Sequence, residues 1–188
     1  MSMRSLSFDL AASKLRLRKK IRGLKLSSSV RKVRGIKLCR KIQKSRFFQD
    51  AAAIGFYAAL PDEIDVFRAA ETALKLGKKV FFPKMKKKSI EFFQVFNLKN
   101  SFKSGAHGVM EPVAKKKMKR IRALDLVLVP GRAFDKKGGR LGRGGGHYDR
   151  LLEKWPSSVR MGVAFREQVV RFVPCEPHDI RMDVVMSA

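Results

Sequence analysis

Hydrophobic residues along the chain fall into two patterns, short unbroken apolar runs and longer stretches with helical spacing. The run Ala51–Tyr57 is short and unbroken, which predicts a buried strand. Pro61-Asp62-Glu63 then predicts a helix start, because proline and acidic residues suit a first turn, and Gly77 predicts the end of that helix. Lys79–Phe82 predicts the next strand, which Pro83 stops, so the two strands should pair in parallel as a βαβ unit. The predicted inner face of the helix is Phe67, Ala70 and Leu74.

The second half of the chain continues this alternation. Ile90–Phe96 alternates and predicts a strand, whereas residues 97–122 contain turn residues and predict irregular structure. Further strands are predicted at Leu124–Val129, Arg160–Phe165 and Val184–Met186. Helices alternate with strands throughout, so we expect one three-layer α/β/α domain over residues 1–188, with a mostly parallel open sheet.

Two basic amphipathic helices are predicted at the N-terminus. The first has Leu10, Leu17, Ile21 and Leu24 on one face, and Gly23 weakens its end. Ser27, Ser28 or Ser29 can cap a second helix that runs to about Gln43. Its predicted inner positions are Val33, Ile36 and Ile42.

Charge changes this picture of an ordinary α/β protein. The 188 residues include 43 Lys and Arg against 16 Asp and Glu, a net charge of +27, and residues 1–50 alone hold sixteen basic and two acidic residues. Such a field attracts nucleic acid, nucleotide phosphates, polyanionic substrates or an acidic membrane face, without choosing among them. We interpret the N-terminal helices as having solvated basic faces, and keep a nucleic-acid-binding arm as the alternative.

Cysteine content and hydropathy indicate the cellular compartment in which the protein is expected. Cys39 and Cys175 give no disulfide framework and no four-ligand metal set, which predicts a reducing cytoplasm. No run approaches the length of a membrane span, and charges interrupt the N-terminus too often for a signal-peptide core.

A glycine-rich basic stretch is the main candidate for chemistry. Six of the fourteen glycines lie between Gly138 and Gly146, interleaved with Arg140 and Arg143. A predicted strand precedes the stretch and a helix start follows it, an arrangement that in α/β proteins binds phosphate groups. Asp149 falls in the first helical turn, where a carboxylate repels phosphate unless a cation such as Mg²⁺ lies between them. Alternatively, Asp149 only caps the helix and the loop is a surface insertion.

Several familiar sites are excluded. The chain has no G-x-x-x-x-G-K-[ST] phosphate loop and no G-x-S-x-G nucleophile elbow. The spacing Gly142-x-Gly144-x-Gly146 differs from G-x-G-x-x-G and lies too far from its strand for a dinucleotide fold. The three histidines are too scattered to indicate zinc. Of the kinds of site considered, binding and reaction of phosphate groups at the glycine-rich stretch is the one that remains.

The residues of this stretch resemble one enzyme family. Pro130-Gly131-x-Ala133-Phe134-Asp135-x-x-Gly138-x-Arg140-Leu141-Gly142-x-Gly144-x-Gly146-x-Tyr148-Asp149 is similar to the signature of the 5-formyltetrahydrofolate cyclo-ligase (5,10-methenyltetrahydrofolate synthetase) family. Weaker matches follow in the right order over nearly the whole chain. They are Lys14-x-x-x-Arg18, Asp62-Glu63-Ile64, Gly108-x-x-Glu111-Pro112, Ala164-Phe165-x-Glu167-Gln168 and His178-Asp179-x-x-Met182-Asp183.

The resemblance implies an enzyme that closes 5-formyltetrahydrofolate to 5,10-methenyltetrahydrofolate, using ATP and Mg²⁺ and releasing ADP and phosphate. It implies ATP contacts at Lys14, Arg18, Arg140, Leu141, Gly142, Arg143, Gly144, Gly145, Gly146, His147 and Tyr148. The implied folate contacts are Ala58, Glu63 (to the pterin), Arg143, Gly144, Gly145, Gly146 and His147. Arg140 and Arg143 would act in catalysis, and Asp149 and Asp179 would hold Mg²⁺.

This chain departs from the family pattern at two positions. His147 stands where the family usually has Tyr or Phe, and Gly145 stands where some members have Lys. A neutral imidazole can still stack on a flat ring, but its charge could make activity pH-sensitive. We also expect a monomer, with nucleic acid bound only through non-specific charge. The lysines of Lys84–Lys88 and Lys115–Arg122 are candidates for binding the polyglutamate tail of cellular folates.

Overall fold

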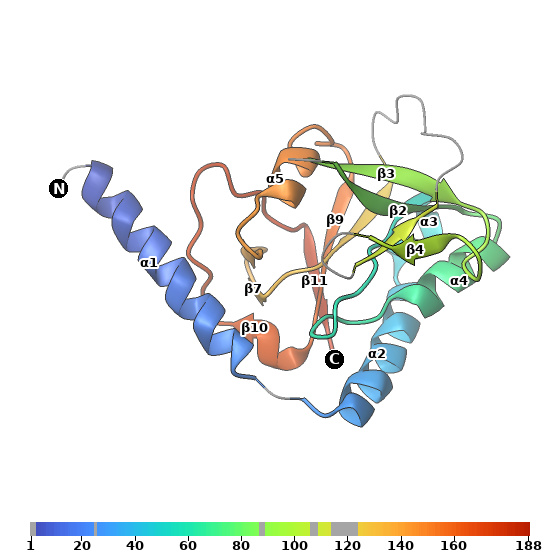
Figure 1. Cartoon of the computed structure of the whole chain (residues 1–188), viewed down its shortest axis with the longest axis horizontal. Coiled ribbons are helices and arrows are strands. Elements are labelled where there is room, and N and C mark those ends of the chain that lie inside the picture. The colour runs from blue at the N-terminus through green and yellow to red at the C-terminus, as the bar shows by residue number, and fades with distance from the viewer. Residues whose placement is uncertain (1–2, 25, 87–88, 106–108, 114–123) are drawn as a thin grey trace.

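The main sheet of the computed structural model has six strands (Figure 1). The structure describes residues 3–24, 26–86, 89–105, 109–113 and 124–188. The strand order is β11-β9-β6-β1-β2-β3. Every neighbouring pair is parallel except β2 with β3, so the predicted mostly parallel open sheet is confirmed. The strands are β1 (Ala53–Gly55), β2 (Lys79–Lys86), β3 (Ser89–Val95), β6 (Leu126–Val129), β9 (Val159–Ala164) and β11 (Val184–Ser187).

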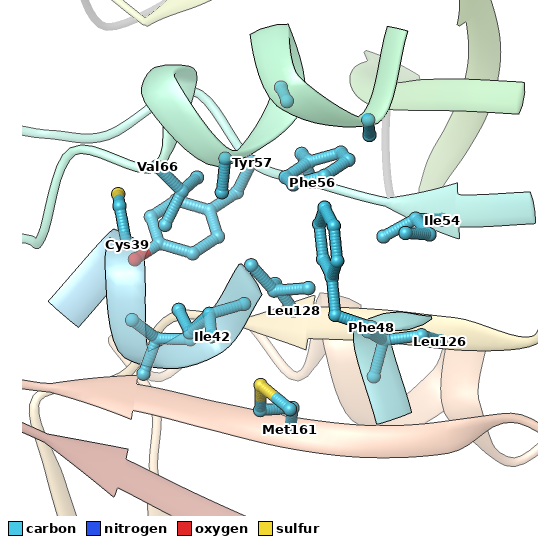
Figure 2. Packing of buried hydrophobic residues seen from close by; sticks show 14 of the residues in the cluster. Cys39, Ile42, Phe48, Ile54, Phe56, Tyr57, Val66, Leu126, Leu128 and Met161 are labelled. Carbon is cyan, nitrogen blue, oxygen red and sulfur yellow. The ribbon is translucent and has the colours of Figure 1, made fainter. Parts of the chain in front are cut away.

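Helices cover both faces of this sheet, as the three-layer prediction requires. Alternate residues of β6 point to opposite faces: Leu126 and Leu128 belong to one buried cluster, Val127 and Val129 to the other. The first cluster packs under α2 (Ser28–Gln43), α3 (Arg46–Asp50) and α4 (Phe67–Lys75), and the second under α5 (His147–Leu152). Figure 2 shows Ile42 of α2 and Phe48 of α3 close to Leu126, Leu128 and Met161.

The predicted βαβ unit is confirmed, but its helix begins later than expected. β1 pairs in parallel with β2, and Gly77, with φ of 73°, follows the end of α4. The helix starts at Phe67, whose N–H donates to Asp65, and not at Pro61. The Asp62 and Glu63 side chains bind arginines from distant segments, so they do not serve a first helical turn.

Strand β2 continues through Pro83, which the sequence predicts as a stop. The carbonyl of Phe81 faces β1 and accepts a hydrogen bond from Phe56. Pro83 lies two residues further along, so its nitrogen faces the same side of the strand. There β1 has already ended at Gly55, so no ladder hydrogen bond requires an N–H at Pro83.

Two smaller sheets complete the fold. β7 (Ala133–Asp135), β8 (Arg140–Leu141) and β10 (Val169–Val170) form one, and α1 (Met3–Arg22) packs on it through Leu17 and Ile21 (Figure 1). A short 3₁₀ helix, Arg166–Gln168, precedes β10. β4 (Phe102–Ser104) and β5 (Met110–Pro112) form the other sheet, inside a segment that the sequence predicts as irregular. The Phe102 ring holds this hairpin against Phe82, with ring centroids 4.9 Å apart.

Two positions expected on the apolar faces of the N-terminal helices are exposed instead. Val33 is 65% exposed and Leu24 43%. The buried face of α2 is instead Gly35, Leu38, Cys39 and Ile42, whereas Ile36 is half-buried. The N-cap of α2 is Ser27, whose side chain accepts a hydrogen bond from Val30, as one of the predicted alternatives has it.

Candidate functional site

A cavity of about 700 Å³ lies at the carboxyl ends of two central strands. Tyr57 and Ala58 follow β1, Pro130 and Gly131 follow β6, and all four residues line the cavity. From β1 the chain moves outward to β2 and β3, then returns to β6 on the other side of β1 and moves outward again. The cavity therefore lies where the winding reverses, which is where open α/β sheets bind ligands.

Every residue that the sequence analysis assigns to ATP, folate or Mg²⁺ lines this cavity. The structure brings together the helix α1, the turn after β1, the glycine-rich loop with the start of α5, and the loop before β11. The predicted residues on its wall are Lys14, Arg18, Ala58, Glu63, Arg140, Leu141, Gly142, Arg143, Gly144, Gly145, Gly146, His147, Tyr148, Asp149 and Asp179.

The buried carboxylate of Asp135 organises the base of the glycine-rich stretch. Its Oδ1 accepts hydrogen bonds from the backbone N–H groups of Lys137 at 2.8 Å and Gly139 at 2.9 Å. Its Oδ2 accepts one from Val173 at 2.9 Å, which ties the β7–β8 turn to the segment after β10. The turn delivers Arg140 into the cavity wall, so Asp135 positions the loop without lining the cavity.

Glycine is required at several points of the loop. Gly144 and Gly146 have φ of 110° and 62°, the left-handed region in which other residues are strained, and Gly146 is the N-cap of α5. Gly138 has φ of 82°, and a Cβ there would overlap the carbonyl oxygen of Met182. The Met182 N–H donates to the Gly138 carbonyl at 2.8 Å, so the turn is held against the segment before β11.

Arg140 is a buried cation held by Asp149. Its Nη2 donates to Asp149 Oδ2 at 2.7 Å, and its Nη1 donates to the Pro130 carbonyl at 3.3 Å. The guanidinium carbon lies 5.7 Å from the centre of the Tyr148 ring. Arg140 Nε is buried and has no hydrogen-bond partner within the described part of the chain. Asp149 Oδ1 accepts from the N–H of Ile180 at 3.3 Å, so this carboxylate joins α5 to the loop before β11.

Helix α1 contributes two cations to the cavity, one helical turn apart. Lys14 is 7% exposed and binds Asp179 at 2.5 Å and also Glu176. Burial opposes the charged form of Lys14, but its hydrogen bonds to both carboxylates raise its pKa above the ordinary value. Burial likewise opposes the charge of Asp179, but the Lys14 hydrogen bond lowers the pKa of that carboxyl. Arg18 Nε donates to the Gly142 carbonyl at 3.0 Å.

Glu63 is a largely buried acid on the opposite wall. Its Oε2 accepts from the N–H of Leu60 at 3.0 Å, and its Oε1 accepts from Arg143 Nη2 at 3.1 Å and Nε at 3.3 Å. Burial raises the pKa of Glu63, against the opposing effect of the Leu60 N–H and Arg143. Burial also raises the pKa of Tyr57, which lines the cavity and donates to the Ile64 carbonyl.

Carboxylates that suit a hard cation lie close together in the loop before β11. Among the described residues, Glu176, His178 and Asp179 offer ligand atoms that lie within 4.8 Å of one another. Asp149 lines the same cavity, although its two oxygens already accept hydrogen bonds from Arg140 and Ile180. The oxygen donors of Asp149, Asp179 and Glu176 fit Mg²⁺ better than a soft metal ion.

Four residues of the site were missed by the sequence analysis. Glu176 is an acid three positions before Asp179, and that spacing could have indicated it. Asp62 and Asp135 stand in the quoted motifs without an assigned role, because their partners lie far away in the sequence. Arg150 Nη2 donates to the Gly145 carbonyl at 2.8 Å and lies 3.1 Å from His147 Nδ1.

His147 and Arg150 also line a second, open groove of about 900 Å³, which shares Ile90, Gly145 and His147 with the first cavity. Its remaining lining residues are Lys86, Ser89, Leu151 and Lys154. Lys86 belongs to the predicted cluster Lys84–Lys88, of which residues 87 and 88 lie outside the described residues. The cluster Lys115–Arg122 lies entirely outside them.

Fold and site together define a class: open α/β-sheet proteins with a basic ligand cavity at the point where the winding reverses. A family model for 5-formyltetrahydrofolate cyclo-ligases matches residues 10–188, and the chain belongs to this family. The resemblance inferred from the motifs is therefore confirmed.

Individual relatives agree with this assignment. A probable 5-formyltetrahydrofolate cyclo-ligase of Caenorhabditis elegans is 31% identical over 156 residues, which cover 76% of each chain. The 5-formyltetrahydrofolate cyclo-ligase of Mus musculus is 28% identical over 151 residues, 74% of each chain. The solved structure of Aquifex aeolicus 5,10-methenyltetrahydrofolate synthetase superposes with a TM-score of 0.80 at 31% identity. The superposition covers 93% of this chain and 89% of that one.

Proposed function

We propose that the chain catalyses the ATP-dependent closure of 5-formyltetrahydrofolate to 5,10-methenyltetrahydrofolate, with release of ADP and phosphate. The observation that carries this proposal is the composition of one cavity. It joins four cations suited to phosphate with a largely buried acid suited to a pterin, at the ligand-binding edge of the sheet. The cations are Lys14, Arg18, Arg140 and Arg143, and the acid is Glu63.

In this proposal the triphosphate of ATP lies between α1 and the glycine-rich loop. Lys14 and Arg18 reach it from α1, and the segment Arg140–Tyr148 wraps it. The residues fit such a group, because guanidinium groups bind phosphate oxygens in pairs and the glycines let backbone approach an anion closely. The positive end of α5 adds to the attraction, and its first turn carries Asp149.

Asp149 and Asp179 would hold Mg²⁺, which supplies charge neutralisation at the phosphates when it is bound. Lys14 and Arg140 now neutralise these two carboxylates. Glu176 adds a third carboxylate that could reach the cation. Metal binding would then leave Lys14 and Arg140 available to phosphate oxygens, so each carboxylate would exchange one cationic partner for another.

The folate would lie against Ala58, Glu63 and the segment Arg143–His147. The amino and ring N–H groups of a pterin are donors, which suits the Glu63 carboxylate. Ala58 is 8% exposed and small, so a flat ring can approach it. His147 offers an imidazole face, and Arg150 donates to its Nδ1, which assigns the proton of the neutral ring to Nε2.

The chemical difficulty of the reaction is that a formyl oxygen is a poor leaving group. ATP, when bound, supplies the phosphoryl group that makes this oxygen displaceable by N10 of the folate. The protein would position the reactants and neutralise charge, with Arg140 and Arg143 acting on the oxygens that become more negative. Arg140 suits this task because it is 7% exposed, and electrostatic stabilisation is stronger where water is excluded.

A spectrophotometric assay with 5-formyltetrahydrofolate, Mg²⁺ and ATP tests the proposal. We expect ATP-dependent formation of 5,10-methenyltetrahydrofolate, lost in Arg140→Ala and in Asp149→Ala. Lys99→Ala, a change at an exposed lysine, should retain turnover. A folded protein that binds ATP and gives no turnover would contradict the proposal and indicate a family member with a different substrate.

The finer features of the substrate and the protein also belong to this proposal. We propose that the basic groove lined by Lys86, Arg150 and Lys154 receives a polyglutamate tail, since it adjoins the cavity at His147. Lys86→Ala/Lys154→Ala should raise KM for polyglutamylated substrate and leave KM for the monoglutamate unchanged. Equal effects on both substrates would contradict it.

We further propose a cytoplasmic monomer that folds as one domain over residues 1–188. Light scattering after size exclusion would test the monomer, and a single cooperative unfolding transition would test the domain. No helix in the described ranges is long and apolar enough to cross a membrane. Both cysteines are free, and burial raises the pKa of Cys39 to about 11.

Nucleic-acid binding stays a second candidate because α1 has a basic outer face. Arg16, Lys19 and Lys20 are exposed there, whereas Lys14 and Arg18 turn into the cavity. This candidate predicts steeply salt-dependent binding that weakens after Arg16→Ala/Lys19→Ala/Lys20→Ala. Methenyltetrahydrofolate formation should not depend on those three residues.

A further inference from the structure

Asp62 lies behind the cavity wall and joins two arginines from different segments. Its Oδ1 accepts a hydrogen bond from Arg143 Nη2, and its Oδ2 accepts one from Arg132 Nη1. With Arg132 it lines a small cavity of about 50 Å³, whereas the residues found to line the large cavity do not include Asp62. The Asp62 carboxylate can therefore influence a ligand in the large cavity through Arg143.

Arg143 spans the space between two walls of the large cavity. Its backbone belongs to the glycine-rich loop, and its guanidinium reaches the turn that contains Asp62 and Glu63. Nη2 is shared between Asp62 and Glu63 Oε1, the latter at 3.1 Å, and Nε donates to the same Glu63 oxygen at 3.3 Å. Two arginines and two carboxylates thus form one chain of ion pairs, Arg132–Asp62–Arg143–Glu63.

Asp62 and Glu63, the two carboxylates that bind Arg143, differ in what else they can bind. Glu63 lines the large cavity and is the acid that the proposed function assigns to the folate. A donor group on that ligand would compete with Arg143 for Glu63 Oε1. Asp62 faces Arg132 on its other side, so a ligand in the large cavity does not compete for it in the same way.

We propose that Asp62 is a positioning residue, which holds Arg143 at the cavity when Glu63 turns to the substrate. Arg132 holds Asp62 in place from behind, because it binds the second carboxylate oxygen. The inference rests on the proposed function, since it requires Arg143 to act on the phosphate that is transferred.

Asp62→Asn tests this role because it removes the charge and keeps the shape of the side chain. We expect kcat to fall roughly tenfold or more, since small displacements of a catalytic group cost one to two orders of magnitude in rate. KM for the folate should change by less than about threefold, because the interaction lost is one made in the transition state. Glu63→Gln should instead raise KM for the folate. Asp62→Glu keeps the charge and should recover part of kcat.

Double-mutant cycles identify the residue through which Asp62 acts. With Arg143→Lys as background, Asp62→Asn should change kcat by less than about twofold, because coupled residues are not additive. With Arg132→Ala as background its effect on kcat should be smaller than in the parent but larger than with Arg143→Lys, because Arg132 only orients Asp62. Glu71→Gln, which removes the carboxylate of an exposed ion pair with Lys75, is the matched control and should leave kcat unchanged.

The possible results separate this inference from the proposed function. No turnover by the parent protein would contradict the proposed function itself. An active parent with unchanged kcat in Asp62→Asn, or with only a raised KM for the folate, would overturn the role of Asp62. A loss of kcat of the same size in the Arg143→Lys background would also overturn it. If Asp62→Asn does not fold, Asp62→Ser, which also removes the carboxylate, gives the same decision in the same two backgrounds.

Discussion

Asp135 offers the sharpest test of how the glycine-rich stretch is held. It is 3% exposed, and its carboxylate accepts three backbone hydrogen bonds, from Lys137, Gly139 and Val173. Asp135→Ala would leave these three N–H groups without an acceptor. A buried donor without a partner costs about 1–3 kcal/mol, and the bonds from Gly139 and Val173 are buried, so these two predict a loss of at least about 2 kcal/mol in the free energy of unfolding. That is a large fraction of a total of about 5–15 kcal/mol.

Asp135→Asn separates two parts of this network. The amide oxygen can replace Oδ1 and keep the bonds from Lys137 and Gly139, so the turn should persist. In the parent protein the N–H of Val173 donates to Oδ2. In the variant the amide nitrogen would take the place of Oδ2 and would face this N–H, donor against donor. We expect a loss of about 1–3 kcal/mol, from this contact alone.

Urea unfolding followed by circular dichroism measures both losses, with Asp9→Ala, a change at an exposed aspartate of α1, as control. The expected order of stability is parent and Asp9→Ala, then Asp135→Asn, then Asp135→Ala. An Asp135→Ala protein within about 0.5 kcal/mol of the parent would refute the reasoning, because that is the effect of an ordinary surface change. So would equal losses in the two Asp135 variants.

Three further predictions concern stability. Gly138→Ala should lower the free energy of unfolding by more than about 2 kcal/mol, because φ of 82° is strained for alanine and its Cβ would overlap the Met182 carbonyl; thermal unfolding measures this. Phe48→Ala, at a fully buried ring, should cost about 3–5 kcal/mol in urea unfolding, and a loss below about 1 kcal/mol would contradict the packing described. The lowered pKa of Asp179 means that its contribution to stability is present above the pKa of the unfolded chain and is lost as pH falls through the folded pKa. The raised pKa of Lys14 means that its contribution is lost only as pH rises through the folded pKa. Lys14→Met should therefore destabilise the protein at neutral pH and have less effect in acid, and a difference independent of pH would contradict the ion pair.

Sequence patterns were sufficient where burial alone decides the structure. The apolar runs at β1, β2, β6 and β9 are strands, and the βαβ unit is parallel as predicted. Patterns failed where a distant partner decides. Pro61-Asp62-Glu63 has the composition of a first helical turn, but arginines from distant loops bind its two acids. Pro83 interrupts a strand only if its nitrogen faces a neighbouring strand, and the side it faces is not visible in the sequence.

The candidate site shows the same limit. The family resemblance named fifteen residues, and all of them line one cavity. The resemblance could do this because members of a family place matching residues at the same site, however far apart they lie in the sequence. It gave no role to Asp62 or Asp135. Asp62 binds Arg143 of the cavity wall, and Asp135 binds the backbone N–H of Gly139, the residue before Arg140. Glu176 was missed for a similar reason, because its partner Lys14 lies at the other end of the chain.

The glycines of the loop perform different tasks, although the sequence presents them as one cluster. Gly138 adopts a left-handed conformation against Met182, and a Cβ on Gly139 would overlap the Asp135 carboxylate, so these two build the turn. Gly144 and Gly146 have positive φ on the cavity wall, so they shape the surface that a ligand meets. Changes at the first pair should therefore lower stability, whereas changes at the second pair should act mainly on ligand binding. Such a division would assign the turn to folding and the rest of the loop to function, although both lie within one motif.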